Sequence, residues 1–366
     1  NGLFSEEIVF SGTTKIQLDA VSFFTGSIDN VSVKEITRDN VPRIDYTGGG
    51  CPHILAEPQR VNTVTYSEDF SQWTASGSPT TLTTGQLSPS GEYNATKISG
   101  TIGSSYIYLS GGGTSATATR TIYARTVSGT GTAKLMSNNS NTNNLFTLTE
   151  EWQRFELTGS PAAAATNSYI DFRDNSQTLS EFIIWGAQSE EASYATSYIP
   201  TSGASVTRNK DTFTRDGIGG LINSEEGVLF LEMAALANDG TYKVITLSDG
   251  TSVNRVTLYY NNVFNELGYN IIISGGGVPF SGITTLSDAT DFIKVAIKWK
   301  VNDFALWING DEVSLDNSGV TFSAGVLTSL LFDNSSNNNY FYGKVKQLQV
   351  YPSALSDSEL TILTTP

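Results

Sequence analysis

Residues 181–208, EFIIWGAQSEEASYATSYIPTSGASVTR, decide how the chain divides. The apolar run Phe182–Trp185 is short and ends at Gly186, which favours a buried strand over a helix. A segment rich in Tyr, Ser and Thr follows, and the Pro-Thr-Ser-Gly sequence at 200–203 cannot continue regular structure. We therefore expect one domain to end here and another to begin.

The composition is typical of an all-β chain. The 366 residues include 34 Gly, 16 Tyr and 18 Phe, and 16% are charged, against roughly 25% in an average globular protein. Long solvated helices are therefore scarce. No apolar run approaches the roughly 20 residues that a membrane helix needs. The length predicts two or three domains.

Charge and residue counts exclude several kinds of partner and site. A net charge of −15 repels phosphate backbones, so neither nucleic acid nor membrane insertion is expected. Cys51 is the only cysteine, which excludes an internal disulfide and a cysteine-based zinc site. A histidine-dependent triad would have to use His53, the only histidine. We interpret Cys51-Pro52-His53 as a loop crossing, because neighbours in sequence seldom meet as nucleophile and base.

Turn residues divide the chain into four parts. Residues 1–38 are too few to bury a core, and their strand order matches that of 152–188, so they are interpreted as the C-terminal part of a first jelly roll. Residues 39–62 form a connector, for which an irregular strap is favoured over a small hairpin between 44–46 and 54–56. We predict a complete jelly roll at 63–200 and a further β-sandwich at 201–366.

Alternation gives the strands of 63–200 two different faces. Ile107 and Leu109 point one way, and Tyr106 and Tyr108 the other. The same pattern recurs in three more strands, and one face is always aliphatic, as a core should be. The opposite face carries aromatic rings and arginines: Tyr106, Tyr108, Tyr123, Arg125, Trp152, Arg154, Tyr169 and Arg173.

The last 160 or so residues contain strong local signals of strand, turn and helix. Glu226–Met233 is apolar on both faces, which predicts a central strand, and Phe292–Val301 alternates with lysines outward. Asn309-Gly310 predicts a two-residue hairpin. Gly343–Tyr351 is expected to close the sheet. The sequence from Ser356 then caps a short terminal helix.

Two segments resemble the laminin-G-like, concanavalin-A-type lectin fold. They are KVKQLQVYPSALSDSELTIL (344–363), in which a last strand leads into a short helix, and FALWINGDEV (304–313), a strand–Asn-Gly–strand hairpin. The resemblance covers roughly residues 222–366. Together with the earlier segments, it implies tandem β-sandwiches: a partial jelly roll, a complete jelly roll of the carbohydrate-binding-module type, and a laminin-G/concanavalin A-like domain.

Other stretches resemble bacteriophage tail fibre or adhesin chains. They are PRIDYTGGGCPHILAEPQRVN (42–62), TYSEDFSQW (65–73), WGAQSEEASYATSYIPTSGASVTR (185–208) and DGIGGLINSEEGVLFLEM (216–233). This resemblance implies a non-enzymatic tail component in the virion or outside the cell, which binds a host-surface glycan and other tail proteins and assembles as a homotrimer. A secreted bacterial adhesin or carbohydrate-binding fragment is one alternative, and a polysaccharide-degrading enzyme of concanavalin A-like fold is another.

The aromatic and arginine face of 63–200 fits glycan binding, because sugars stack their C–H faces on rings and give their hydroxyls to polar groups. The alternative, which we favour, is that these rings pack against a neighbouring domain or chain with arginine stems covering them. Trp307 is a further glycan-binding candidate if its face is open, although buried sheet packing is the preferred interpretation. Tyr259, Tyr260 and Tyr269 would join it.

No cofactor is certain, and calcium is the one candidate. Asp249, Asp333 and Asn334 stand at strand ends, where oxygen ligands can hold Ca²⁺, although such residues usually form turns. Catalysis is not expected. Retaining glycosidases need two carboxylates about 5 Å apart, and the Glu-x-Asp-x-x-Glu pattern used in this fold does not occur, since Glu225, Glu226 and Glu232 lack that spacing.

Overall fold

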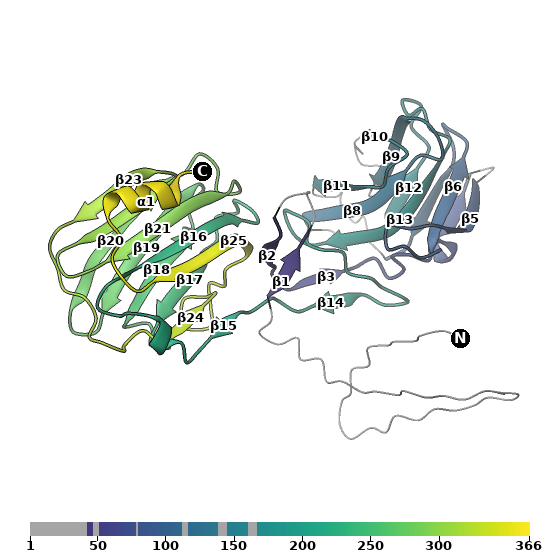
Figure 1. Ribbon diagram of the computed structural model, residues 1–366. Coiled ribbons are helices and arrows are strands. Elements are labelled where there is room, and N and C mark those ends of the chain that lie inside the picture. Colours follow the sequence, from purple (N-terminus) through teal and green to yellow (C-terminus); the bar gives the residue numbers. More distant parts are fainter. Residues whose placement is uncertain (1–41, 47–50, 78–79, 112–115, 138–144, 160–166) are drawn as a thin grey trace, which may run out of the picture. The chain divides into compact units, whose positions relative to one another are not determined.

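The computed structural model describes residues 42–46, 51–77, 80–111, 116–137, 145–159 and 167–366. The predicted remnant of a first jelly roll, residues 1–38, lies outside them. The described part of the chain forms two antiparallel sandwiches, a short ribbon and one α-helix (Figure 1). The predicted fold class, all-β with tandem sandwiches, is confirmed.

The N-terminal sandwich packs two five-stranded sheets face to face. The first sheet has the order β10 (Phe146–Leu148), β9 (Gly131–Ser137), β12 (Ser168–Asp171), β7 (Tyr106–Leu109) and β4 (Thr74–Ser76). The second has the order β11 (Gln153–Gly159), β8 (Ala118–Arg125), β13 (Glu181–Glu190), β6 (Ala95–Gly100) and β5 (Thr80–Gln86). A 3₁₀ turn, η1 (Phe70–Gln72), precedes β4.

The core of this sandwich contains the aliphatic face that alternation predicts. Ile107 and Ile122 are at most 1% exposed, whereas Tyr108 and Tyr123, their neighbours in sequence, are half-buried. Phe172 stacks on Phe182 with ring centroids 5.2 Å apart. Burial of the aliphatic set therefore turns every tyrosine at the alternate positions outward.

β13 continues past the point where the apolar run ends. Its pairing with β8 shifts register between Trp185 and Gln188, and Gly186 lies in this bulge at φ +67°. A Cβ at Gly186 would come within 3.2 Å of the Tyr123 ring and 3.3 Å of the Tyr198 ring. Glycine favours the left-handed backbone here, and any Cβ would require the two rings to shift by a few tenths of an ångström.

The C-terminal sandwich packs a seven-stranded sheet against a six-stranded one. The first has the order β1 (Arg43–Asp45), β2 (His53–Ala56), β25 (Gly343–Tyr351), β16 (Gly227–Ala235), β21 (Ile293–Trp299), β22 (Phe304–Ile308) and β23 (Asp311–Asp316). The second has the order β15 (Thr214–Arg215), β24 (Ser329–Leu331), β17 (Lys243–Ser248), β18 (Arg255–Tyr260), β19 (Glu266–Ile273) and β20 (Gly277–Thr285). The 3₁₀ turn η2 (Gly219–Leu221) follows β15.

Local predictions for this sandwich are confirmed. β16 is the central strand of its sheet, and Asn309 and Gly310 form the hairpin turn at φ 50° and 94°. The terminal helix α1 (Asp357–Thr364) begins with a capping box, in which the Ser356 backbone N–H donates to Glu359 Oε2 at 2.8 Å. The helix lies on the outer face of the seven-stranded sheet, where Leu360 is fully buried (Figure 1).

The expected outward orientation of Lys298 on β21 is confirmed, but the inward orientation expected for Val301 is wrong. Lys298 lies on the outer face, as its parity requires, but it is only 4% exposed in its side chain because α1 covers that face. Its ammonium group lies 2.6 Å from Asp303 Oδ1. Val301 is exposed, because the strand ends at Trp299 and the chain has already turned.

The favoured irregular strap for residues 39–62 is also wrong, and the hairpin alternative is correct. β1 pairs with β2, with Ile44 opposite Ile54, and β2 pairs with β25. The hairpin thus pairs with β25, which would otherwise be an edge strand with unpaired backbone groups, and β1 becomes the edge of the sheet. A separate ribbon joins β3 (Arg60–Asn62) to β14 (Val206–Arg208).

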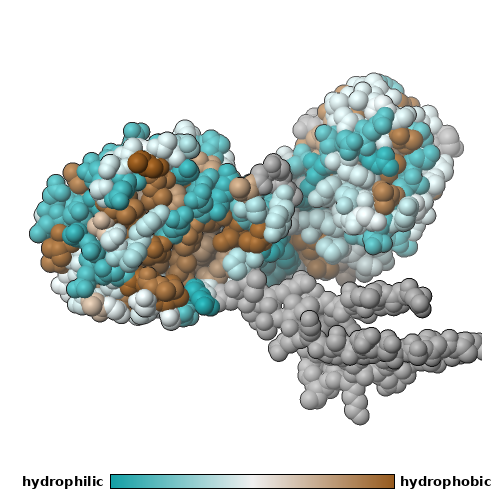
Figure 2. All heavy atoms as spheres, viewed as in Figure 1, coloured by the Kyte–Doolittle hydropathy of each residue, from teal (hydrophilic) through white to brown (hydrophobic). Residues whose placement is uncertain are grey.

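The surface is mostly polar, as the composition requires. Figure 2 shows hydrophilic residues in teal and white, with apolar residues in brown over part of the C-terminal sandwich sheet on which α1 lies. In the described segments no helix is long and apolar enough to cross a membrane.

Candidate functional site

The eight residues predicted for the N-terminal sandwich lie on the outer faces of two different sheets. Tyr106, Tyr108, Tyr169 and Arg173 belong to β7, β12 and the residues just after β12. Tyr123, Arg125, Trp152 and Arg154 belong to β8, β11 and the residue before β11. They form two patches rather than the single surface that alternation suggested.

The first patch, called here the tyrosine patch, consists of Tyr106, Tyr108, Tyr169 and Arg173. Tyr108 pairs directly with Tyr169 across β7 and β12, and the two rings stack with centroids 5.6 Å apart. Tyr106 lies 6.0 Å from Tyr108 and 5.8 Å from Tyr169. Tyr106 and Tyr108 are half-buried, whereas Tyr169 is only 9% exposed, so the surface that solvent reaches consists mainly of the Tyr106 and Tyr108 rings.

Arg173 lies over two rings of the tyrosine patch, those of Tyr106 and Tyr169. Its Nε and Nη2 donate to the two oxygens of Asp171 at 2.9 and 2.6 Å, and its guanidinium lies 4.1 Å from the Tyr106 ring centroid. The hydrogen bonds that Arg173 donates to Asp171 raise the pKa of Arg173. Because a bidentate carboxylate neutralises this guanidinium, the tyrosine patch carries no uncompensated positive charge from Arg173.

The second patch, called here the arginine–aromatic patch, consists of Tyr123, Arg125, Trp152 and Arg154. Arg154 is directly opposite Tyr123, and its guanidinium lies 5.7 Å from that ring. The Arg125 guanidinium lies 5.4 Å from the Trp152 ring. All four side chains are half-buried. Cation–π contact at these distances is worth roughly 0.5–1 kcal/mol at exposed sites.

Two aromatic residues that sequence reasoning did not assign complete this face. Trp185 packs against Tyr123 and Tyr198, with ring centroids 5.3 and 4.6 Å away. The Tyr198 hydroxyl donates to Ser67 Oγ at 2.7 Å, and burial raises the pKa of Tyr198. Strand parity could have revealed Trp185, because it alternates with the core residue Ile184 on β13.

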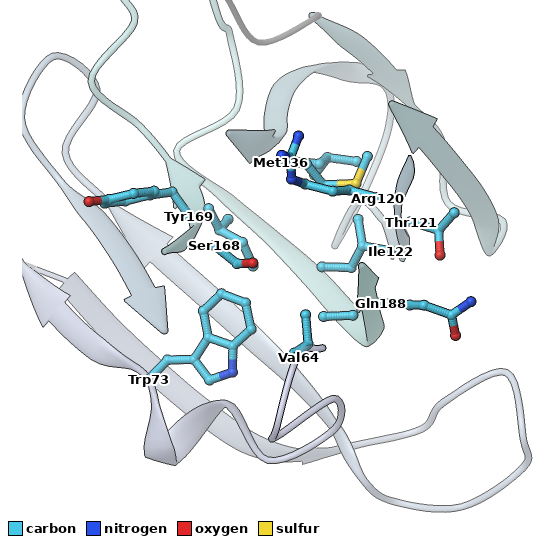
Figure 3. A pocket seen from close by; sticks show the side chains of 12 residues that line it. Val64, Trp73, Arg120, Thr121, Ile122, Met136, Ser168, Tyr169 and Gln188 are labelled. Atoms are coloured by element: carbon cyan, nitrogen blue, oxygen red, sulfur yellow. The ribbon is translucent and has the colours of Figure 1, made fainter. Parts of the chain in front are cut away.

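The pocket in Figure 3 lies inside the N-terminal sandwich and is too small to hold a sugar. This cavity has a volume of about 20 Å³ and lies between Trp73, Arg120, Met136 and Tyr169, among others. It is far below the roughly 300 Å³ of the smallest usual ligand pockets. Arg120 is 5% exposed, and burial lowers its pKa. Arg120 has the same strand parity as the core residue Ile122, so its inward orientation could have been predicted from the sequence, but it was not.

Trp307 does not lie on an open face. It is 7% exposed and packs with Phe230 and Leu360 in the cluster beneath α1. The prediction of an accessible Trp307 is therefore wrong, and the packing interpretation is correct. Tyr260 and Tyr269 are also buried in the sandwich core, whereas Tyr259 is half-buried on the opposite face. No sugar-stacking surface forms around Trp307.

The predicted calcium ligands serve turns. Asp249 Oδ1 accepts from the Thr251 N–H at 2.9 Å, and its Oδ2 accepts from Asn254 at 2.8 Å. Burial acts to raise the pKa of Asp249, but these hydrogen bonds outweigh it and lower that pKa. Asp333 is buried, which raises its pKa, and it accepts from the Ser335 N–H.

As they stand, these oxygens do not fit a calcium ion. Ca²⁺ needs six to eight oxygen ligands, and the side-chain oxygen of Asn334 already accepts from the Ser336 N–H, while its carbonyl oxygen accepts from Arg255 Nη1. Within the described ranges no group of three or more His, Cys, Asp or Glu side chains could hold a metal. The side chain of an Asp or Asn at the start of a turn accepts a hydrogen bond from the N–H two residues later. This role explains why Asp249, Asp333 and Asn334 stand at strand ends.

Comparison with family models and with curated proteins gives no match. Solved structures with a similar fold include the CBM40 of the Ruminococcus gnavus IT-sialidase bound to α2,3-sialyllactose, at 19% identity and a TM-score of 0.36, covering 42% of this chain and 92% of that chain. The native heptameric SAP-like pentraxin from Limulus polyphemus matches at 11% identity and a TM-score of 0.30, covering 38% and 70%. The receptor-binding domain of botulinum neurotoxin C/D mosaic serotype matches at 13% and 0.30, covering 38% and 35%. These values describe a distant likeness.

Proposed function

We propose that this protein is a non-enzymatic receptor-binding component of a bacteriophage tail, and that the tyrosine patch contacts a host-surface glycan. The observation that carries the glycan part is the pair of half-buried rings of Tyr106 and Tyr108, which pack against the buried ring of Tyr169. Aromatic rings on the outer face of a sheet present apolar surface on which the C–H face of a pyranose packs. The strands hold the rings in place, so binding loses little side-chain entropy.

Polar groups around the rings support the same proposal. The described residues provide no hydrogen-bond partner for the hydroxyls of Tyr106 and Tyr108, which leaves both hydroxyls available to a ligand. Asn167 Nδ2 donates to the Tyr169 hydroxyl at 3.2 Å and adds an amide to the edge of the patch. Sugars need this combination of an apolar face and hydroxyl partners.

The tail assignment rests on the sequence resemblance of residues 42–62, 65–73, 185–208 and 216–233 to tail fibre chains. In this proposal the chain is in the virion tail, outside the cell, as a homotrimer in contact with other tail proteins, and the C-terminal sandwich presents neighbouring domains. Detection of the chain in purified virions by mass spectrometry tests this location. A secreted adhesin would instead be found in the culture supernatant without virions.

A glycan array tests the binding proposal. The variant Tyr106→Ala/Tyr108→Ala should weaken binding about tenfold or more, which is ~1.4 kcal/mol. Tyr93→Ala is the matched control, because Tyr93 is 75% exposed in the same sandwich outside both patches. Light scattering on the same variants tests the alternative of packing against another chain. Unchanged binding with a changed oligomeric state would replace the glycan proposal by an interface.

Incubation of candidate polysaccharides with the full chain tests the non-enzymatic part. We expect no release of reducing ends or of unsaturated sugars. Time-dependent release by the purified chain would show an enzyme instead.

A further inference from the structure

We propose that the arginine–aromatic patch is a second glycan site, specific for sugars that carry a carboxylate. It deepens the proposed function, on which it rests, by assigning an acidic ligand class to the sheet opposite the tyrosine patch. The relevant side chains are Arg125 and Arg154, with the rings of Tyr123 and Trp152.

The first argument is that neither arginine is paired with a carboxylate of the described chain. No carboxylate of the described chain lies within 4.0 Å of the Arg125 or Arg154 guanidinium, and each is instead held by an aromatic ring. By contrast, Arg173 is paired with Asp171, and Arg208 with Glu57. Glu156 lies on the same face of β11, but its Oε1 accepts from the Ala195 N–H at 3.2 Å. In a chain of net charge −15, two guanidiniums without a carboxylate partner favour an anion at this face.

The strand register places the two arginines within reach of one ligand. Arg154 is opposite Tyr123, and the next pair along is Gln153 with Ala124. Arg125 therefore comes two positions after Tyr123, diagonal to Arg154 on the same face. Such diagonal positions are about 7–8 Å apart, and long side chains span that distance. One carboxylate can thus take hydrogen bonds from both guanidiniums.

Unused donors are the second argument. Arg154 Nη2 donates to Thr121 Oγ1 at 2.9 Å, and its buried Nε has no acceptor in the described chain. Arg125 Nη1 donates to the Thr126 carbonyl at 3.3 Å. A guanidinium has five N–H donors, so most remain for a ligand. Trp185, 6% exposed beside Tyr123, likewise has a buried indole N–H without an acceptor there.

The rings define the rest of the ligand. Tyr123 and Trp152 flank the guanidiniums and offer apolar surface next to the positive charge. A uronic or sialic acid has a sugar ring for the aromatic surface and a carboxylate for bidentate arginine contact. A simple anion would use the arginines alone, and a neutral sugar would leave them without a partner. The acidic saccharide is the class that satisfies both parts.

The test uses the full chain on an array that holds uronic-acid-containing, sialic-acid-containing and neutral oligosaccharides. Arg125→Gln/Arg154→Gln should lose binding to the acidic members by about tenfold or more and keep any binding to the neutral ones. Arg215→Gln/Lys300→Gln, which removes the same charge at exposed positions elsewhere, should keep both. Thermal unfolding of each variant shows whether it is folded.

Single substitutions keep the test usable if the double variant does not fold. Arg125→Gln and Arg154→Gln should each weaken acidic binding, and added NaCl should weaken it in the wild type. Acidic binding that survives both substitutions, or that the control pair abolishes equally, overturns the proposal. Binding of neutral glycans alone, dependent on Tyr106 and Tyr108, also overturns it but leaves the proposed function intact. No binding of any glycan overturns both.

Discussion

Arg208 Nη1 lies 2.5 Å from Glu57 Oε2, which joins two residues 151 positions apart in the sequence. The same Glu57 oxygen accepts from Arg43 Nη2 at 2.6 Å, and Glu57 Oε1 accepts from the Ser197 N–H at 2.8 Å. Glu57 is 3% exposed. One buried carboxylate thus connects the β1–β2 hairpin, the segment before β14 and β14 itself.

Glu57→Gln should destabilise the fold by roughly 3 kcal/mol, because removal of one partner of a buried ion pair leaves charges without compensation. Urea unfolding followed by far-UV circular dichroism measures the shift in the first transition. The control is Glu181→Gln, whose partner Lys97 is 3.4 Å away on the surface, and where we expect under about 1 kcal/mol. Equal effects of the two variants would contradict a buried, connecting role for Glu57.

Gly186→Ala should cost more stability than Gly129→Ala. Both glycines have φ +67°, so the backbone penalty of about 1–2 kcal/mol is shared. Only at Gly186 would the Cβ press on the rings of Tyr123 and Tyr198, since nothing lies within 4 Å of one at Gly129. Thermal unfolding compares the variants, and tryptophan fluorescence should change for Gly186→Ala because Trp185 is adjacent. Identical unfolding would show that the rings move aside freely.

Leu360→Ala should release α1 from the sheet. Leu360 is fully buried against Phe230 and Trp307, and Leu→Ala in a core costs about 2–5 kcal/mol. Trp307 should then become accessible to a fluorescence quencher. Ile362→Ala, on the same helix at 77% exposure, is the control and should leave quenching unchanged. If quenching stays the same in both variants, the helix does not protect Trp307.

His53 should titrate below its ordinary pKa of 6.5, because burial of its ring outweighs the opposing effect of Asp45. Its Nε2 lies 3.6 Å from Asp45 Oδ2. Since His53 is the only histidine, its NMR resonance is unambiguous. Asp45→Asn should lower the pKa further. A pKa above 6.5 in the wild type, or a rise in Asp45→Asn, would contradict this account.

The stability consequence of His53 follows from proton linkage. Between 6.5 and the lower folded pKa, the unfolded chain binds a proton that the native state does not. The contribution of His53 to the free energy of unfolding therefore falls as pH falls through that window, and levels off below it. His53→Gln should remove this component, which a comparison of urea unfolding at pH 7 and just below the measured pKa detects.

Much of the N-terminal sandwich could be predicted, but its site could not. Alternation correctly turned Tyr106 and Tyr123 away from the core. Alternation could not show that β7 and β8 belong to opposite sheets. The side of a strand on which a residue lies depends on adjacent residues, whereas the strands beside it are set by distant parts of the chain. The single predicted surface is therefore two patches with different charge, because Arg173 forms an ion pair with Asp171 whereas Arg125 and Arg154 lie over aromatic rings.

Sequence alone determined what short-range geometry dictates: the face on which each side chain lies, the Asn309-Gly310 turn, and the capping box at Ser356. Only tertiary structure decided what covers each face. α1 buries Trp307, a residue about fifty positions before it, and β2 pairs with β25 across almost the whole chain. The period of a strand is set by bonds between adjacent residues, whereas the identity of its neighbours depends on burial of apolar surface summed over distant segments.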